Sequence, residues 1–334
     1  MSGERRQPAW VDQLGRWIRP AAPSPGKKPP AARTGRLALG LQGGGALGAF
    51  TWGVLDRLLE DQRLPLTAIG GTSAGAVNGA VLVSGWMRAG PTGARAALDR
   101  LWRRLSETGR PAWMPGVGQA AGAVALDVTS RLFSPYQLNP LDLNPLRDLL
   151  DEEVDFPALA DPAAPELVIA ATRIRDGEAR LFRRGQITRD AILASACLPS
   201  LHQAVEIDGE GYWDGGYSAN PPLKPLVADE RDRPTDLLVV QLNPLAYGAL
   251  PTSSREIMQR LNQIVFNRSL LEDWPGLEAA AAAGRFRLHR LAIDFDGLPP
   301  GGALDLDWAF LEALKDQGRA KASAWIETRP LTQT

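Results

Sequence analysis

The clearest candidate for chemistry in this chain is the hydroxyl of Ser73, in the turn Gly71-Thr72-Ser73-Ala74-Gly75. A short apolar run before this G-x-S-x-G pattern predicts a buried strand, and the residues after it predict a helix. A serine at so sharp a strand-to-helix turn exposes its hydroxyl, and its neighbours must be small to allow the turn. The spacing therefore indicates a nucleophilic serine. A serine that only caps the helix is the structural alternative.

A glycine-rich loop, Gly43-Gly44-Gly45, comes directly after the first predicted strand. Because the loop opens a helix, its backbone N–H groups are not used by the helix and can bind an anion or an oxyanion. The string from Gly43 to Gly48 also matches G-x-G-x-x-G, a feature of dinucleotide sites. Such a site needs an acidic residue at the end of the second strand, where this chain has only small residues. We therefore interpret the loop as an oxyanion-binding loop.

A third small-residue turn, Asp214-Gly215-Gly216, follows the strand-like segment 206–213. Its carboxylate could act as the base for Ser73, although aspartate before glycine is also common in ordinary turns. An unperturbed aspartate has a pKa of about 3.9 and is a poor base for a hydroxyl. Removal of the carboxylate from water would raise that pKa, so a catalytic Asp214 should lie in a partly desolvated site.

In their order and content, the three turns resemble the motifs of the patatin-like phospholipase family. The chain has GGGALG after the first predicted strand, GTSAG after the second, and a later segment, Asp214 to Pro221, similar to the family's D-G-G-x-x-x-N-x-P. The resemblance runs through roughly residues 36–330. It implies a three-layer α/β/α sandwich with a mostly parallel central sheet. It also implies hydrolysis of acyl esters by a serine–aspartate dyad, without a histidine or a cofactor.

Carried over residue by residue, the resemblance implies that Ser73 is the nucleophile and that Asp214 activates it. It also implies that the glycines at 43–45 supply the N–H groups of an oxyanion hole. One position departs from the pattern, because the family often has Arg or Lys where Leu47 stands. The loop therefore adds no positive charge for a phosphate head group. Phospholipid, lysophospholipid, acylglycerol and storage polyester all remain open as substrates.

Two other functions are compatible with the same residues. An esterase of the α/β-hydrolase type would use a triad in the chain order Ser73, Asp214, His289. His289 lies in an alternating segment, 285–291, which predicts a solvent-facing position on an edge strand and disfavours the triad. The second alternative is a non-catalytic lipid-binding protein of the same fold, which the presence of both Ser73 and Asp214 disfavours.

Composition argues against several other classes of protein. The 334 residues carry a formal net charge of −1, without the basic excess typical of nucleic-acid-binding proteins. A single cysteine, Cys197, rules out an intramolecular disulfide framework and a thiolate-built zinc site. With only two histidines, His202 and His289, we expect no metal centre. The chain begins without a secretory signal and has no apolar run long enough to span a bilayer, which predicts a cytoplasmic protein.

From residue 37 onward the hydrophobic pattern alternates between strands and helices. Strands are predicted at 37–41, 67–71, 166–172, 179–183, 203–213, 236–242 and 286–293. Helices are predicted near 47–58, 73–84, 92–106, 144–153, 188–196, 253–271 and 307–326. Asn144 before Pro145, and Ser253 with Glu256 three residues later, predict two of the helix starts. The alternation predicts a mostly parallel sheet with helices on both faces.

The chain divides into a tail, residues 1–36, and a predicted hydrolase domain, residues 37–330. The tail is proline-rich and basic, with eight Lys/Arg against two acidic residues. Within it, residues 8–19 have the spacing of a short amphipathic helix with two tryptophans on one face. This helix could dock on its own domain, belong to a disordered tail, or contact an anionic membrane surface peripherally. In the hydrolase domain, the irregular segment at about 109–140 predicts a lid or binding loop.

Overall fold

The computed structural model describes residues 35–61, 65–108, 134–228, 234–246, 248, 250–299 and 301–328. The predicted N-terminal helix within residues 8–19 lies outside the described residues. The predicted lid-like segment at about 109–140 is described only from Ser134 onward, where it contains the short helix α5 (Pro135–Leu138). All three small-residue turns lie within the described part of the chain.

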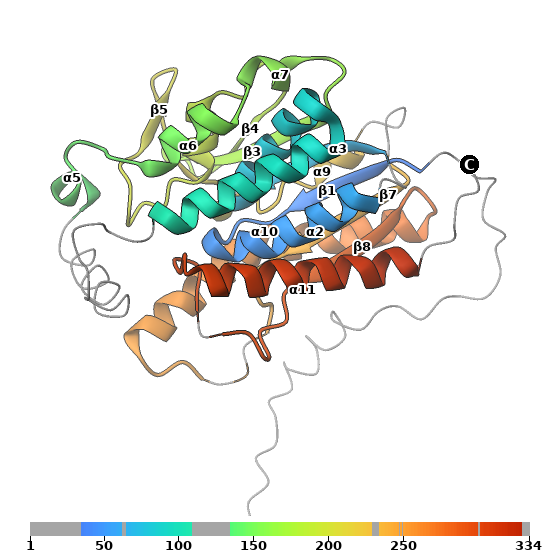
Figure 1. Cartoon of the computed structure of the whole chain (residues 1–334). Coiled ribbons are helices and arrows are strands. Elements are labelled where there is room, and N and C mark those ends of the chain that lie inside the picture. The colour runs from blue at the N-terminus through green and yellow to red at the C-terminus, as the bar shows by residue number, and fades with distance from the viewer. Residues whose placement is uncertain are drawn as a thin grey trace, which may run out of the picture.

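A sheet of eight strands forms the centre of the molecule (Figure 1). The strands are β1 (Leu37–Leu41), β2 (Leu66–Thr72), β3 (Glu166–Arg173), β4 (Ala179–Phe182), β5 (Val205–Ile207), β6 (Glu210–Asp214), β7 (Asp236–Gln241) and β8 (Arg287–Ala292). Their order is β5-β6-β3-β2-β1-β7-β8, and β4 pairs with β3. β3, β2, β1, β7 and β8 run parallel, whereas β4, β5 and β6 pair antiparallel. The predicted mostly parallel central sheet is confirmed.

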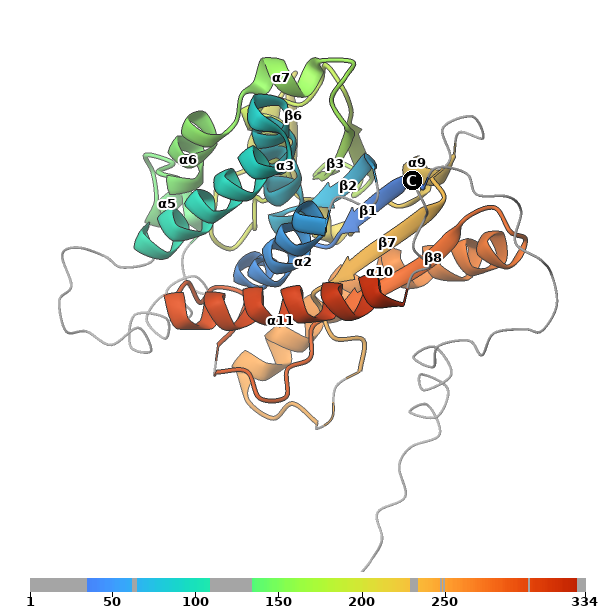
Figure 2. The ribbon, with the colours of Figure 1, turned by 45° about the vertical axis from the view of Figure 1, so that its right-hand side comes forward.

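Helices cover both faces of this sheet and complete the three predicted layers (Figure 2). The first layer contains α2 (Gly48–Asp61), α3 (Ala74–Thr108), α6 (Pro145–Glu153), α7 (Phe156–Ala160), α8 (Arg189–Ser195) and α11 (Trp308–Glu327). The opposite layer contains α9 (Lys224–Val227) and α10 (Ser254–Ala282). Two short 3-10 helices, η1 (Gly45–Leu47) and η2 (Gly215–Tyr217), follow β1 and β6.

Alternate residues of the central strands face the two layers. In β1, Leu39 and Leu41 belong to the hydrophobic cluster that includes α2, α3 and α11, whereas Ala38 belongs to the cluster that includes α9 and α10. All five residues of β1 are buried. Burial on both faces explains why this strand is a continuous apolar run rather than an alternation of polar and apolar residues.

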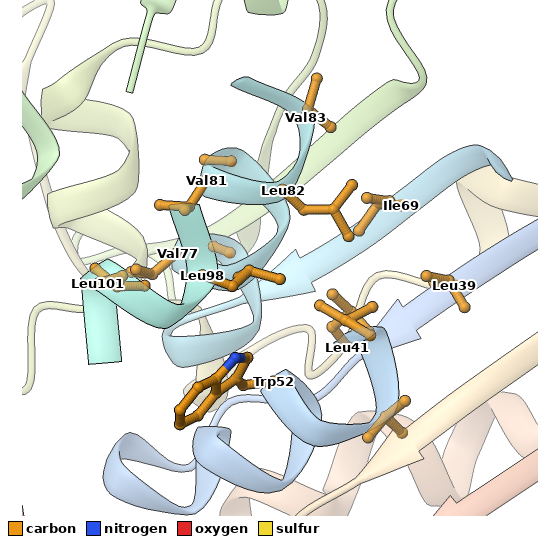
Figure 3. Packing of buried hydrophobic residues seen from close by; sticks show 14 of the residues in the cluster. Leu39, Leu41, Trp52, Ile69, Val77, Val81, Leu82, Val83, Leu98 and Leu101 are labelled. Carbon is orange, nitrogen blue, oxygen red and sulfur yellow. The ribbon is translucent and has the colours of Figure 1, made fainter. Parts of the chain in front are cut away.

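Packing between the sheet and the first layer fixes the elements that lead into the small-residue turns. Leu41 of β1, Ile69 of β2 and Leu82 of α3 lie close together in the buried cluster (Figure 3). The ring of Trp52 in α2 stacks on that of Trp102 in α3, with ring centroids 6.2 Å apart. Because η1 and α2 follow β1, and α3 follows β2, this packing holds the glycine loop and Ser73 at fixed positions relative to each other.

The segment predicted as one strand at 203–213 is instead a hairpin of β5 and β6. The chain reverses at Asp208 and Gly209, which both have positive φ, 53° and 78°. Asp and Gly are among the residues that most readily adopt this left-handed conformation. The hairpin matters for the site because β6 ends at Asp214.

Most of the helical predictions match the structure in position and length. The predicted helices 73–84 and 92–106 both lie within α3, which consists of two helices that meet at Ala89 and Gly90, where the backbone leaves the helical conformation. The helix predicted at 253–271 continues to Ala282. Both predicted helix starts are confirmed: Asn144 accepts a backbone N–H, and Ser253 forms a capping box with its N3 glutamate.

Candidate active site

Strand β3 brings the predicted nucleophile and the predicted base together. Thr72, the last residue of β2, lies opposite Ala170 of β3 in the parallel pairing. Asp214, the last residue of β6, lies opposite the next residue, Ala171, in the antiparallel pairing. The pairing of β2 with β3 therefore ends one residue before the pairing of β6 with β3 begins. As a result Ser73, which follows Thr72, and Asp214 lie next to each other beside β3. No local pattern in the sequence could have predicted this register.

Ser73 occupies the sharp turn predicted for it. Gly71 and Thr72 end β2, and Ala74 and Gly75 open α3. The backbone of Ser73 has φ of 53°, a left-handed conformation that a residue with a side chain adopts only under constraint. The residue is 7% exposed. The strained turn and the start of a helix match the geometry expected of a nucleophilic serine.

Asp214 is fully buried, with 0% exposure. Its Oδ1 accepts the backbone N–H of Gly216 at 2.7 Å, and its own N–H donates to the carbonyl of Cys197 at 2.8 Å. The other carboxylate oxygen, Oδ2, makes no well-aligned hydrogen bond within the described residues. Gly215 and Gly216 form the start of η2 directly after it.

Burial raises the pKa of Asp214 from its ordinary value to about 7. Removal from water disfavours the charged carboxylate, and no cation in the described part of the chain counters this effect. The N–H of Gly216 and the hydroxyl of Ser73 both favour the charged form and so oppose the rise in pKa. Asp214 is therefore a stronger base than an exposed aspartate, as a catalytic role requires.

The glycine loop passes directly against Ser73. A Cβ on Gly43 would lie 2.7 Å from the Cβ of Ser73, so a larger residue would force the two segments apart. The N–H of Gly43 donates to Oδ1 of Asn220 at 2.6 Å. The expectation that all three glycines offer free N–H groups therefore needs correction, because that of Gly43 is already used. Within the described residues, the N–H groups of Gly44 and Gly45 make no hydrogen bond.

His289, the histidine of the alternative triad, lies elsewhere in the sheet. It is in the edge strand β8, as predicted, and pairs in register with Leu238 of β7. The predicted solvent-facing position is wrong, because the side chain is only 23% exposed and its ring packs on Trp325. Its Nε2 is 2.7 Å from Oδ1 of Asp236, a buried aspartate that also accepts two hydrogen bonds from Arg287. Because its Nε2 contacts Asp236 rather than Asp214, the triad is not formed.

The remaining candidates for chemistry are not reactive in this structure. Cys197 is buried, its Sγ donates to the carbonyl of Gln203, and burial raises its pKa to about 12. It is therefore a neutral thiol at physiological pH. Burial also lowers the pKa of His202. Within the described ranges, no cluster of three or more His, Cys, Asp or Glu residues could hold a metal ion. No helix there is long and apolar enough to span a membrane.

The comparison with known protein families matches the part of the chain that contains the three turns. The family model of the patatin-like phospholipases matches residues 39–227, more than half of the chain, and this range contains all three turns. The chain belongs to the patatin-like phospholipase family.

Individual relatives of this member of the patatin-like family are distant. It is 28% identical over 194 residues to the uncharacterized protein YjjU of Escherichia coli, an alignment that covers 57% of this chain and 48% of YjjU. The chain thus spans about half the length of this relative. Among solved structures, VipD from Legionella pneumophila is similar with a TM-score of 0.45 and 15% identity, over 89% of this chain and 67% of that chain. ExoU in its complex with SpcU, from Pseudomonas aeruginosa, has a TM-score of 0.45 and 17% identity, over 90% and 53%.

The patatin-like site also depends on polar residues that the sequence analysis did not identify. Gln42, fully buried before the glycine loop, accepts the backbone N–H groups of Leu242 and Asn243 at 2.8 and 2.9 Å. Its side-chain amide donates to Asn267 of α10 at 2.9 Å, and Asn243 donates to the carbonyl of Gly43. These partners are more than 190 residues from the loop, so no local signal could have revealed them.

Asn220 is the one supporting residue that the motif contained. It is the N of D-G-G-x-x-x-N-x-P, and its two side-chain groups bind different segments. Its Oδ1 accepts from Gly43, and its Nδ2 donates to the carbonyl of Phe266 in α10. The segment that follows Asp214 therefore holds the glycine loop in place as well. The two motifs are connected by a hydrogen bond between residues 177 positions apart.

The raised pKa of Asp214 predicts how activity depends on pH. If its carboxylate must be deprotonated to accept a proton, kcat/KM for a soluble acyl ester should be level above pH 7. Below the pKa of about 7 it should fall about tenfold per pH unit. The measurement is kcat/KM between pH 5 and 9, with thermal unfolding at each pH to show that the protein stays folded. Activity that stays constant down to pH 5 would contradict the raised pKa.

Proposed function

We propose that this protein hydrolyses the acyl esters of lipids, with Ser73 as the nucleophile and Asp214 as the base. The observation that carries the proposal is that pairing with β3 brings together a strained serine, after β2, and a buried carboxylate with a pKa of about 7, at the end of β6. A general base is most effective when its pKa lies near the working pH. Membership of the patatin-like phospholipase family supports a lipid substrate.

The reaction begins with transfer of the Ser73 proton to Asp214. The Oδ2 atom of Asp214 is the natural acceptor, because Oδ1 already accepts from Gly216. The serine oxygen then bonds to the ester carbonyl carbon, and the electron pair of the carbonyl moves to its oxygen. When the tetrahedral intermediate collapses, the alcohol leaves with the proton held by Asp214. Water attacks the acyl-enzyme in the same way and releases the carboxylic acid.

The oxyanion would be stabilised by the N–H groups of Gly44 and Gly45 rather than by all three glycines. The N–H of Gly43 serves a structural purpose by donating to Asn220. Gly45 has φ of 57°, and a Cβ there would collide with the carbonyl of Ala303, so the loop conformation requires glycine. Loss of one such donor typically costs about 10²–10³ in rate.

Recognition of the substrate would rest on its acyl chain more than on a charged head group. Leu47, where the family often has a basic residue, is buried at 6% exposure and adds no charge to the glycine loop. A lipid with a neutral or zwitterionic head group therefore suits this site better than one whose binding requires a cation in the loop. Phospholipid, acylglycerol and storage polyester can be separated by assay on each.

The first test is covalent labelling of the nucleophile. A fluorophosphonate probe should label Ser73, and Ser73→Ala should remove both the label and hydrolysis of a soluble acyl ester. Asp214→Asn should lower kcat by several orders of magnitude, whereas His289→Ala should stay within about tenfold of the wild type. Full hydrolysis by pure Ser73→Ala protein would overturn the proposal. Loss of activity in His289→Ala equal to that in Ser73→Ala would restore the triad.

We also propose that residues 8–19 contact anionic membrane surfaces peripherally. The support is the amphipathic spacing and the basic excess of the tail, eight Lys/Arg against two acidic residues in residues 1–36. Deletion of residues 1–35 should leave turnover of a soluble ester unchanged. It should weaken binding to anionic vesicles, most strongly at low salt. Equal vesicle binding by the full chain and the deletion variant would contradict this role.

A further inference from the structure

The N-terminal half of α10 exposes apolar side chains and buries polar ones. Five large apolar side chains, each between 40% and 50% exposed, follow the spacing i, i+1, i+4, i+7, i+8 of a single helix face: Ile257, Met258, Leu261, Ile264 and Val265. The buried face of the same helix includes the polar residues Gln263 and Asn267. A helix on the surface of a soluble domain normally buries its apolar face and exposes its polar one.

The catalytic turns explain why the inner face is polar. Asn267 bonds to Gln42 before the glycine loop, and the ring of Phe266 packs edge-on against Tyr217 of η2 at 5.1 Å. These two residues directly follow Val265 in the chain. The apolar face therefore lies next to the helix turn whose buried residues contact Gln42, before the glycine loop, and Tyr217, after Asp214.

Other exposed apolar residues lie at the same end of the molecule. In Figures 1 and 2, α5 and the N-terminal half of α10 lie at the end of the molecule towards which the parallel strands, such as β1 and β7, point. Leu141 and Leu143, between α5 and α6, are 78% and 68% exposed. Leu304 is 63% exposed and follows Ala303, whose carbonyl accepts the N–H of Ala46 beside the glycine loop.

The described segments at this end of the molecule contain as many acidic as basic residues. Segments 134–143, 250–265 and 301–304 together contain two acidic residues, Asp142 and Glu256, and two basic ones, Arg255 and Arg260. A surface that is apolar and electrically neutral is complementary to an uncharged apolar partner. A strongly charged polymer or an acidic protein surface would be matched by charges of the opposite sign.

We propose that this apolar face docks on the surface of a neutral or zwitterionic lipid aggregate. The inference rests on the proposed lipid hydrolase function and adds to it how the substrate reaches the site. Docking there would bring the lipid layer to the end of the parallel strands that Ser73 follows. Binding through such a face depends on buried apolar area, so it should respond only weakly to salt.

The test compares two sets of substitutions on one helix. The variant Ile257→Ser, Leu261→Ser, Ile264→Ser removes the apolar face, and Gln259→Ser with Asn262→Ser is the matched control, since both are exposed polar residues of α10. The face variant should lose about tenfold or more of its binding to phosphatidylcholine vesicles, at low and high salt alike. It should turn over a soluble short-chain ester at the wild-type rate. The control should match the wild type in both assays.

Unchanged vesicle binding by the face variant would overturn the proposal. If that result came with a change from dimer to monomer, the face would belong to a second copy of the chain. If it came with a loss of thermal stability, other residues of this chain would cover the face. Failure of the wild type to hydrolyse any ester would instead overturn the proposed function, because vesicle binding is measured separately from turnover.

A second inference concerns the end of α8 and rests on different contacts. Oγ of Ser195 accepts the N–H of Ser73 at 2.9 Å and donates to the carbonyl of Ala170 at 2.6 Å. Two residues later, the carbonyl of Cys197 accepts the N–H of Asp214. Ser195 and Asp214 are both fully buried. One short segment therefore holds the backbone of the nucleophile and the backbone of the base.

We infer that Ser195 is a positioning residue for the Ser73–Asp214 pair. The N–H of Ser73 lies just before the first residue of α3 and has no acceptor within that helix, so the hydroxyl of Ser195 satisfies it. The same hydroxyl fixes the left-handed turn at Ser73 to β3, the strand that pairs with Asp214. Loss of this link should misalign the serine hydroxyl and the carboxylate without removing either group.

Ser84 provides a matched control for this test. It is also fully buried, and its Oγ likewise accepts a backbone N–H, from Asp155, and donates to a backbone carbonyl, that of Glu153. Ser195→Ala and Ser84→Ala each remove one buried hydroxyl that bridges two backbone groups. The two variants should therefore lose similar thermal stability.

The two variants should differ in kinetics. Ser195→Ala should lower kcat and the rate of fluorophosphonate labelling about tenfold or more at a nearly unchanged KM, whereas Ser84→Ala should keep the wild-type kcat. Ser195→Cys, which leaves no void and weakens the hydrogen bonds, should show the same kinetic defect. Wild-type kcat in either Ser195 variant, or an equal loss of kcat in Ser84→Ala, would overturn the inference.

Discussion

Asp214 lies in the interior at the end of β6. Its charged form is favoured by the N–H of Gly216, which donates to Oδ1, and by the hydroxyl of Ser73. Because burial raises its pKa to about 7, the carboxyl group of the folded protein stays protonated up to about that pH. Because the folded pKa exceeds the unfolded one, this residue favours folding below about pH 4. That contribution is lost as the pH rises towards 7. The same desolvation that destabilises the fold at neutral pH makes Asp214 an effective base.

The other contacts of the site keep this buried carboxylate beside Ser73. β3 sets the separation through its register with Thr72 and Asp214. Ser195 and Cys197 hold the two backbones from the first helical layer, and Asn220 ties the segment after Asp214 to the glycine loop. α10, on the opposite face, closes the arrangement through Asn267. Each support comes from a different element, so the site depends on both faces of the sheet.

The sequence was sufficient to predict most of the elements and the three small-residue turns, because their signals are local. A buried strand, a glycine loop and a helix start each depend on a few neighbouring residues. The sequence could not show that Gly43 is already hydrogen-bonded, since its partner Asn220 lies 177 residues away. It predicted that His289 lies on an edge strand but not that Asp236 holds it, since that contact depends on the pairing of β7 with β8. Positive φ at Asp208 and Gly209, which splits the predicted strand into a hairpin, was likewise missed.

The central claim, that Ser73 and the buried Asp214 carboxylate act as a pair, is tested most directly by titration of that carboxyl group. Carbon-13 NMR of the protein labelled at aspartate side chains, with Asp214→Asn to assign the signal, reports the pKa itself. The account predicts a midpoint near 7 in the wild type. It also predicts a higher midpoint in Ser73→Ala, since the serine hydroxyl lowers the pKa. A midpoint near 4, or one that Ser73→Ala leaves unchanged, would contradict it.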